Sequence, residues 1–299
     1  MPDTTSSQRP ALLALLATVL IWAYSWIVMK LALRYCGPFD FAALRYVFGA
    51  LLLFAMLALM RQSLRPPPLL LTAAIGLCQT AAFQGLEQWA LIGGGAGHVA
   101  LLAYTMPFWA VLLAWLMLRE RPHRRHWLGL MLAAAGLLCI VEPWHGLGGG
   151  WSTLLAIGGG AAWAAGTVLS KRMFQRHAPS PLNLTAWQML AGALVLCLTA
   201  WLVPQRAIDW SWTFIGVLGY SAVLASSVAW LLWLIVLQRL PTAVASLSSL
   251  GVPLVSVLLA WAILRERPSV MEGVGMVLVM GGLLAVSGAR LRPEPPRSR

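Results

Sequence analysis

The sequence predicts an all-α polytopic membrane protein with ten transmembrane helices, arranged as two inverted five-helix repeats. Composition is the first observation: 60% of the residues are hydrophobic and only 10% are charged, whereas a soluble domain carries about 25% charged residues. The second observation is a block that occurs twice, VLLAWLMLRERP at residues 111–122 and VLLAWAILRERP at residues 257–268, with ten of twelve positions identical. Because an internal repeat decides the architecture before local signals do, the chain is predicted to contain two copies of one unit.

Apolar segments long enough to cross a bilayer give the number of helices, since a span needs about 20 mainly apolar residues. Each segment is bounded by glycine, proline or charged residues, which interrupt helices. The ten predicted spans are residues 11–33, 40–60, 69–91, 96–118, 126–142, 151–172, 182–202, 211–237, 242–264 and 270–289.

The repeat extends beyond the duplicated block and defines the domain boundaries. Trp22 matches Trp163 at an offset of 141 residues, and Pro107 matches Pro253 at an offset of 146. The segment EPWHGLGGG, which is rich in glycine and proline, is the predicted seam. The predicted organisation is a cytoplasmic tail at residues 1–10, a first repeat at 11–142, a linker at 143–150, a second repeat at 151–289 and a basic cytoplasmic tail at 290–299.

Basic residues predict the orientation of the spans. Fifteen of the 21 lysines and arginines fall on the face shared by the two termini and the even-numbered gaps between spans. Positive residues accumulate on the cytoplasmic side, so both termini are predicted to lie in the cytoplasm. Because five is odd, the two copies enter the membrane from opposite sides. Inverted repeats of this kind are typical of secondary transporters that work by alternating access.

Several function classes are excluded by the same patterns. The net charge of +12 does not indicate nucleic acid, because the basic residues lie in short gaps between apolar runs. The chain has no G-x-x-x-x-G-K-[ST] loop for a nucleotide, no C-x-x-C spacing for a metal and no H-E-x-x-H motif. We therefore expect no cofactor, no metal site and no enzymatic activity, and partners limited to the lipid bilayer and a small-molecule substrate.

Both halves resemble a known family unit. Each has W-A-x6-K in its first helix, a proline in its fourth helix followed by L-R-E-R-P, and a glycine-spaced fifth helix. This pattern is similar to the EamA unit of the drug/metabolite transporter superfamily, and within it to YddG-type bacterial exporters of aromatic and other amino acids. The resemblance implies a location in a bacterial inner membrane. The second copy has Gln188 where the first has Arg45, so no shared binding role is assigned to that position.

Candidate site residues are the polar, aromatic and helix-breaking residues inside the spans, where polar groups are costly and therefore functional candidates. Trp230, Ser226 and Ser227 on the eighth span form a further set. The predicted substrate-binding residues are Trp22, Gln79, Phe83, Tyr104, Trp163, Ser246 and Ser249, the predicted helix breaks are Pro107 and Pro253, and the possible ionisable sites are Glu87 and His98.

Each candidate also has a structural interpretation that the sequence leaves open. Glu87 binds a substrate amine or a proton, or it caps a helix or pairs with Arg45 or Lys30. In the structural interpretation, His98 makes hydrogen bonds that only hold helices in place. The serines then serve helix–helix packing, and the tryptophans belong to the core or face lipid. Lys30 is expected to extend to the membrane interface, outside the site.

The resemblance and the mid-span tryptophans together predict an exporter of amino acids of broad specificity, including aromatic and large neutral ones. The alternative is export of drugs, nucleosides or other small metabolites on the same fold. The sequence leaves open the coupling ion and the oligomeric state, and it is compatible with a monomer.

Overall fold

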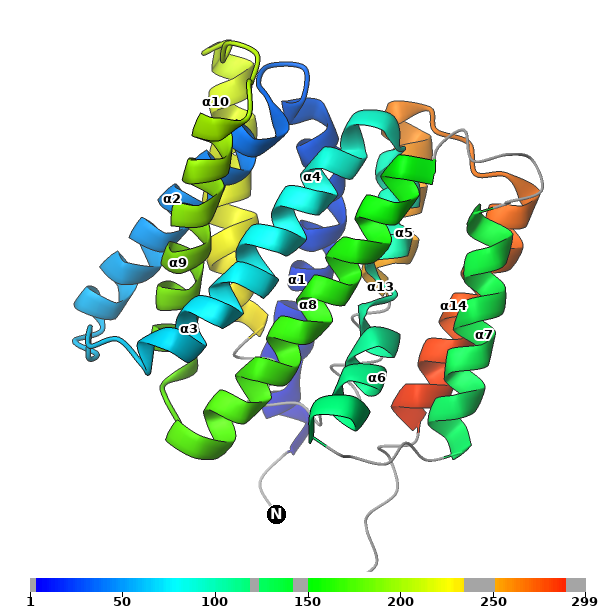
Figure 1. The fold of residues 1–299 in the computed structure, drawn as a ribbon, viewed down its shortest axis with the longest axis horizontal. Helices are drawn as coiled ribbons and strands as arrows, with labels where there is room; N and C mark the ends of the chain where they lie inside the picture. The colour runs from blue at the N-terminus through cyan, green and yellow to red at the C-terminus, as the bar shows by residue number, and fades with distance from the viewer. Residues whose placement is uncertain (1–3, 119–123, 142–149, 234–250, 289–299) are drawn as a thin grey trace, which may run out of the picture.

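The computed structural model describes residues 4–118, 124–141, 150–233 and 251–288, and these residues form helices and connecting loops without a β-strand (Figure 1). The first repeat contains α1 (Thr4–Ala32), α2 (Pro38–Leu59), α3 (Leu69–Ile75), the π-helix η1 (Gly76–Ala82), α4 (Phe83–Gly93), α5 (Ala96–Ala103), α6 (Met106–Leu118) and α7 (Arg124–Val141). The second contains α8 (Gly150–His177), α9 (Pro181–Leu202), α10 (Trp212–Gly219), the π-helix η3 (Tyr220–Val228), α13 (Gly251–Leu259), the π-helix η4 (Ala260–Leu264) and α14 (Val270–Gly288).

Within the described residues, seven helical segments are long and apolar enough to cross a membrane, and three shorter apolar helices accompany them. They fall on the predicted spans, with two differences at the ends. Helix α1 begins at Thr4, inside the predicted tail, and α8 continues to His177, beyond the predicted end at residue 172. Helix α8 stops where Ala178 adopts a left-handed φ of 42° immediately before Pro179, which disfavours helical geometry in the residue it follows.

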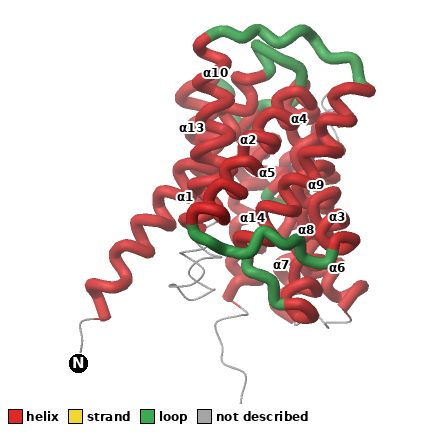
Figure 2. The backbone as a smooth tube through the Cα atoms, turned by 90° about the vertical axis from the view of Figure 1, so that its left-hand side faces the viewer, coloured by secondary structure: helices red, strands yellow, loops and turns green. Residues whose placement is uncertain are grey.

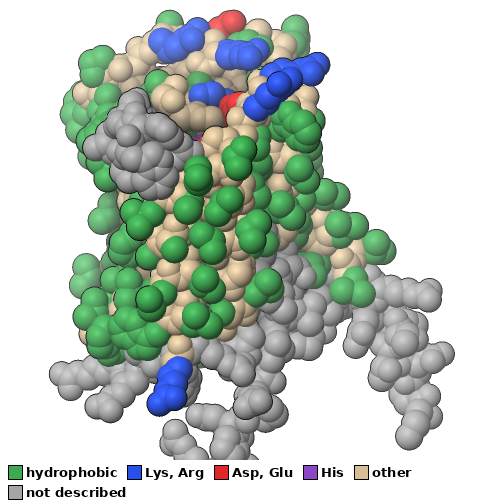
Figure 3. All heavy atoms as spheres, turned by 90° about the vertical axis from the view of Figure 1, so that its right-hand side faces the viewer, with side chains coloured by type: hydrophobic (Ala, Val, Ile, Leu, Met, Phe, Trp, Pro, Cys, Tyr) green, Lys and Arg blue, Asp and Glu red, His purple; other side chains and the backbone are tan. Residues whose placement is uncertain are grey.

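The helices lie side by side in one bundle, with the connecting loops gathered at its two ends (Figure 2). The start of α1 and the end of α14 lie at the same end (Figure 1). On the face drawn in Figure 3, charged side chains lie toward the two ends and hydrophobic side chains cover the region between them. This distribution suits a bundle surrounded by lipid, because charge is costly at membrane depth.

Helices α7 and α14 show the inverted relation of the repeats directly. A Cβ added at Gly136 would lie 2.8 Å from the carbonyl oxygen of Gly275, and one added at Gly282 would lie 2.7 Å from the carbonyl oxygen of Gly129. The offset of 146 residues relates Gly129 to Gly275 and Gly136 to Gly282. Exchanging the repeats therefore turns one glycine contact into the other, as a two-fold axis between the helices requires.

The π-helices η1 and η3 are a second repeat-related pair, since they occupy the third span of each half. Each packs against a glycine of the other half: Gly192 of α9 meets the carbonyl oxygen of Gly76 in η1, and Gly49 of α2 meets that of Ala222 in η3. π-Helical segments are rare and occur frequently at functional sites. Both π-helices therefore lie where the two halves of the chain contact each other.

The fourth span is broken at Tyr104 and Thr105, between α5 and α6. Pro107 lies in the first turn of α6, and because it has no N–H, the carbonyl of Ala103 loses its intrahelical donor. That carbonyl faces Gly160 of α8, where an added Cβ would lie 2.9 Å from its oxygen. The helix break that the sequence predicts at Pro107 thus lies two to three residues before the proline, where the chain packs against α8 of the second repeat. Pro253 is buried near the start of α13, and residues 234–250 before it lie outside the description.

Candidate functional site

An aromatic cluster joins four spans, two from each repeat. Trp22 of α1 contacts Trp230 and Trp233, which follow η3, with ring centroids 5.9 and 5.7 Å apart. Trp230 stacks on Trp163 of α8 at 6.1 Å and an interplanar angle of 30°. Trp163 in turn meets Phe83 of α4 edge-on at 4.7 Å. The two tryptophans that the sequence relates by repeat are therefore connected through Trp230, near the middle of their spans.

The tryptophans of the cluster leave part of their ring surface uncovered. Its four tryptophans are partly exposed although they lie inside the spans, whereas Phe83 is buried. The indole Nε1 of Trp22 donates to the carbonyl oxygen of Ala225 at 3.1 Å, so this ring is fixed by a hydrogen bond. Indole rings provide wide apolar faces that prefer offset-stacked and edge-on partners.

A buried polar group lies beside the cluster. The guanidinium of Arg45 donates from Nε to Ser226 Oγ at 2.8 Å and from Nη1 to Gln84 Oε1 at 3.4 Å. Arg45 is 5% exposed, and no carboxylate of a described residue lies within 4.0 Å of its nitrogens. Ser226 is one helical turn before Trp230, and Gln84 directly follows Phe83. A cation without an anion at this depth is costly unless a ligand supplies the negative charge.

Gln79 and Tyr104 lie in the same region without joining the ring contacts. Gln79 of η1 donates from Nε2 to Thr167 Oγ1 at 3.3 Å, one turn beyond Trp163 on α8. Tyr104 is buried at the end of α5 and belongs to the hydrophobic core against which Trp22 and Trp163 pack. The contacts thus connect four of the seven predicted substrate residues, Trp22, Gln79, Phe83 and Trp163. Among the described residues, no ring contact or side-chain hydrogen bond joins Tyr104 to them, and Ser246 and Ser249 lie outside the described residues.

Glu87 occupies the interface between α4 and α8. Its side chain is fully buried, and neither carboxyl oxygen has a hydrogen-bond partner among the described residues. The carboxyl lies against Gly159, where any Cβ would overlap Glu87 Oε1. Neither Arg45 nor Lys30, the partners that the sequence suggests, is within ion-pair distance.

His98 is held in a polar bridge between helices. Its Nδ1 lies 2.6 Å from Glu272 Oε1 of α14, and its Nε2 lies 3.4 Å from Thr153 Oγ1 of α8. Glu272 also accepts from the backbone N–H of Ser269, whose hydroxyl accepts from the N–H of Glu272. This reciprocal pair is a capping box at the start of α14. Both nitrogens of His98 thus have structural partners.

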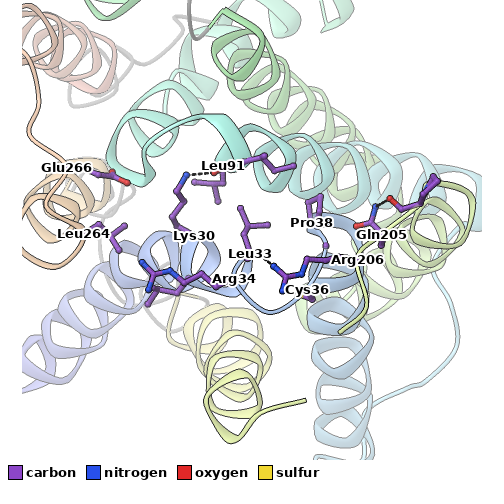
Figure 4. Close-up of a pocket in the computed structure, with 14 residues that line it drawn as sticks. Lys30, Leu33, Arg34, Cys36, Pro38, Leu91, Gln205, Arg206, Leu264 and Glu266 are labelled. Atoms are coloured by element: carbon purple, nitrogen blue, oxygen red, sulfur yellow. Dashed lines mark hydrogen bonds between the residues drawn. The ribbon is translucent and has the colours of Figure 1, made fainter. Parts of the chain in front are cut away.

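A cavity of about 490 Å³ opens at one end of the bundle, where α1 ends and α2 begins (Figure 4). Lys30, Arg34, Arg206 and Glu266 give its lining four charged groups. Burial raises the pKa of the Cys36 thiol in this lining to about 12. Lys30 is eight residues after Trp22, which corresponds to about 12 Å along a helix. The cavity is therefore separate from the aromatic cluster.

Two charged residues of this cavity close helix ends. The ammonium of Lys30 donates to the carbonyl oxygens of Leu91 and Gly94 at the end of α4 (Figure 4). Glu266 Oε2 accepts from the backbone N–H of Gly97 at 3.3 Å, at the start of α5. Each charge matches the helix dipole that it faces. Lys30 thus stabilises a helix end instead of extending into the interface, and Glu266, from the second LRERP block, joins the two repeats.

Comparison with protein families decides the classification. The model of the EamA-like transporter family matches residues 9–142 and again residues 150–288. The chain belongs to the EamA-like transporter family. It is accordingly a polytopic membrane transporter made of a duplicated unit, as the repeat predicts.

Curated relatives of this EamA-like chain align over nearly its whole length. It is 29% identical to the "Probable amino-acid metabolite efflux pump" of Salmonella typhimurium, covering 96% of this chain and 97% of the relative. It is 24% identical to the "Uncharacterized transporter YoaV" of Bacillus subtilis (91% and 94% covered) and 26% identical to the "Uncharacterized inner membrane transporter YedA" of Escherichia coli (95% and 92%). A crystal structure whose description names no function superposes with a TM-score of 0.67 at 21% identity, covering 96% of this chain and all of the other.

Arg45 and Trp233 lie in this region of the EamA-like chain, and the sequence reasoning assigns neither to the site. A signal was present, because Arg45 is a cation six residues into an apolar span of about 21 residues. The unmatched Gln188 in the second copy argued against it. The structure places Gln188 in a different setting, buried with its Oε1 unpartnered among the described residues. Repeat symmetry therefore locates the scaffold of the site better than its side chains.

Proposed function

We propose that this protein is a secondary transporter that exports amino acids of broad specificity, including aromatic and large neutral ones, across the inner membrane by alternating access. Both termini then lie in the cytoplasm. The aromatic cluster beside Arg45, a buried guanidinium with no carboxylate partner among the described residues, carries the proposal. A zwitterion with an apolar side chain offers a carboxylate to Arg45 and a hydrophobic group to the tryptophans. The printed name of the Salmonella relative adds support.

Alternating access is supported by where the cluster lies. Trp22 and Phe83 come from the first repeat, while Trp163 and Trp230 come from the second. Rocking of one half against the other would separate these rings, open the site to one side and then to the other. Inverted-repeat transporters bind their substrates at such an interface near the bilayer midplane.

We expect purified protein in proteoliposomes to accumulate labelled tryptophan, phenylalanine or leucine by counterflow against the same unlabelled amino acid. Saturable uptake with trans-stimulation distinguishes a carrier from a pore. Liposomes without protein provide the control. Failure of a full panel of amino acids would contradict amino-acid export while leaving the family assignment intact.

Replacing Trp163 with leucine should weaken transport of aromatic amino acids more than that of small ones. Loss of the stacking surface that Trp163 offers an aromatic cargo should raise the half-saturating concentration of tryptophan roughly two- to tenfold, since an aromatic pair is worth about 0.5–1.5 kcal/mol beyond burial. Trp201→Leu is the matched control, because Trp201 is 81% exposed on α9. Equal effects of both replacements on tryptophan transport would show that Trp163 is not part of the substrate site.

Stacked indoles also suit planar heterocycles, which is the observation that favours nucleosides or aromatic drugs as the alternative cargo. Such compounds present an apolar face to Trp163 and Trp230 but no carboxylate to Arg45. Competition of a nucleoside panel against labelled tryptophan separates the two proposals. Strong competition by uncharged heterocycles, with weak competition by amino acids, would favour the alternative.

A further inference from the structure

We propose that Glu87 is a proton-binding site that couples transport to the proton gradient. The proposal rests on secondary transport, but it does not require that amino acids are the cargo. Its basis is a carboxyl group that is fully buried inside a span, without a hydrogen-bond donor or a counter-charge among the described residues. An ionised carboxylate in such a place has nothing to replace its lost hydration, whereas a carboxylic acid has no charge to desolvate.

Lys30, Arg45 and His98 are the basic residues of the spans in α1, α2 and α5, and each has partners other than Glu87. Lys30 of α1 donates to carbonyls at the end of α4, and Arg45 of α2 donates to Ser226 and Gln84. His98 of α5 is bridged to Glu272 and Thr153. Helix α8 presents Gly159, and α9, which meets α4 at Gly85 through Leu196, contains no Asp, Glu, Lys, Arg or His. This arrangement therefore accommodates the neutral acid.

Gly159 provides the space that this carboxyl occupies. An added Cβ at Gly159 would overlap Glu87 Oε1 and lie 3.2 Å from its Cγ. The carboxyl belongs to the first repeat and the glycine to the second. Because alternating access moves one repeat against the other, it also moves this glycine surface away from Glu87. Water or a cation can then reach the carboxyl, and the proton can leave on one side of the membrane and return on the other.

Glu87 is also close to the candidate substrate site along the chain. It is four residues after Phe83 on α4, and Gly159 is four residues before Trp163 on α8. One helical turn therefore separates the Phe83–Trp163 ring contact from the Glu87–Gly159 contact on both helices. Any motion that separates the rings also opens the space around the carboxyl, which links cargo movement to proton movement.

The test compares Glu87→Gln with wild-type protein in proteoliposomes, using labelled tryptophan. Wild-type protein should accumulate tryptophan above equilibrium when a pH gradient is imposed, and a protonophore should abolish this accumulation. Glu87→Gln should keep counterflow, which needs no net proton movement, and lose the gradient-driven accumulation. Asp209→Asn, which removes an exposed loop carboxyl, should behave as the wild type.

Several outcomes would overturn the proposal. Gradient-driven accumulation by Glu87→Gln at the wild-type level would do so. Wild-type accumulation that persists in the presence of the protonophore would also overturn it, and this result does not depend on whether the variant folds. If a stably folded Glu87→Gln loses counterflow too, the carboxyl contacts the cargo and the assignment to proton coupling is wrong.

An infrared measurement separates this proposal from the identity of the cargo. Purified wild-type protein without substrate should show the carbonyl stretch of a protonated carboxylic acid at a pH at which exposed carboxyls are ionised. Glu87→Gln should lack that band, and Asp209→Asn should retain it. A band absent from the wild type would overturn the proton site. If the band is present but no amino acid shows counterflow, the proton site stands and amino-acid export fails.

Discussion

Replacing Arg45 with glutamine should abolish high-affinity binding of amino acids and leave a folded protein. A hydrogen bond to a charged group is worth about 1.5–3 kcal/mol, so the half-saturating concentration should rise roughly ten- to a hundredfold. Glutamine retains a donor for Ser226 or Gln84 but not the charge that attracts a carboxylate. Arg45→Lys should recover only part of the affinity, because an ammonium lacks the planar fork of a guanidinium.

The cargo itself supplies the decisive control. Tryptophanamide has the same ring and amine as tryptophan but no carboxylate, so it should compete equally for wild-type and Arg45→Gln protein. Loss of both ligands would indicate a damaged fold. Arg176→Gln removes the same charge from an exposed position at the end of α8 and should leave transport unchanged. Unchanged tryptophan affinity in Arg45→Gln would exclude Arg45 as the carboxylate site.

Replacing Gly136 with alanine should lower the stability of the bundle. The new Cβ would lie 2.8 Å from the carbonyl oxygen of Gly275 and 3.0 Å from the backbone nitrogen of Val279, so α7 and α14 must move apart. Overpacking of this kind costs about 1–3 kcal/mol. Thermal unfolding in detergent should therefore show a lower Tm, and Gly282→Ala, its repeat-related counterpart, should show a similar loss.

Gly281→Ala is the matched control on α14, since nothing lies within 4 Å of its added Cβ. Alanine is favoured over glycine inside a helix by about 0.5–1 kcal/mol, so this variant should unfold at or above the wild-type temperature. The two replacements thus have opposite expected signs. A Tm for Gly136→Ala equal to that of Gly281→Ala would contradict the close approach of α7 and α14.

The architecture could be predicted from sequence because hydropathy and repetition report on the whole chain at once. Spans follow from apolar length, and inversion follows from the odd number of helices, five, in each repeat. The contacts of Gly129 and Gly136 with α14 agree with that inference. The π-helices could not be predicted, because one extra residue per turn leaves no recognisable pattern in a segment that is apolar throughout.

The site could be predicted only in part. Trp22 and Trp163 stand out in the sequence because a tryptophan in the middle of a span differs from one at the membrane interface. Their connection through Trp230 depends on how η3 packs between α1 and α2, which no local pattern encodes. Glu266 also gives no signal of its role. It belongs to a block that resembles a charged helix end, and its contact with Gly97 arises only when the two repeats fold together.

The equivalence of η1 and η3 has a consequence for how the repeats have diverged. Gln84 and Glu87 lie two and five residues after the end of η1, and Trp230 and Trp233 lie two and five residues after the end of η3. One ancestral helix face has thus become polar in one copy and aromatic in the other. A molecule bound between the two repeats would contact polar side chains on one side and aromatic side chains on the other. It would therefore keep one orientation while it is transported. A chain built from two copies of the first repeat would keep the two-fold arrangement of helices but would no longer favour one orientation of the bound molecule.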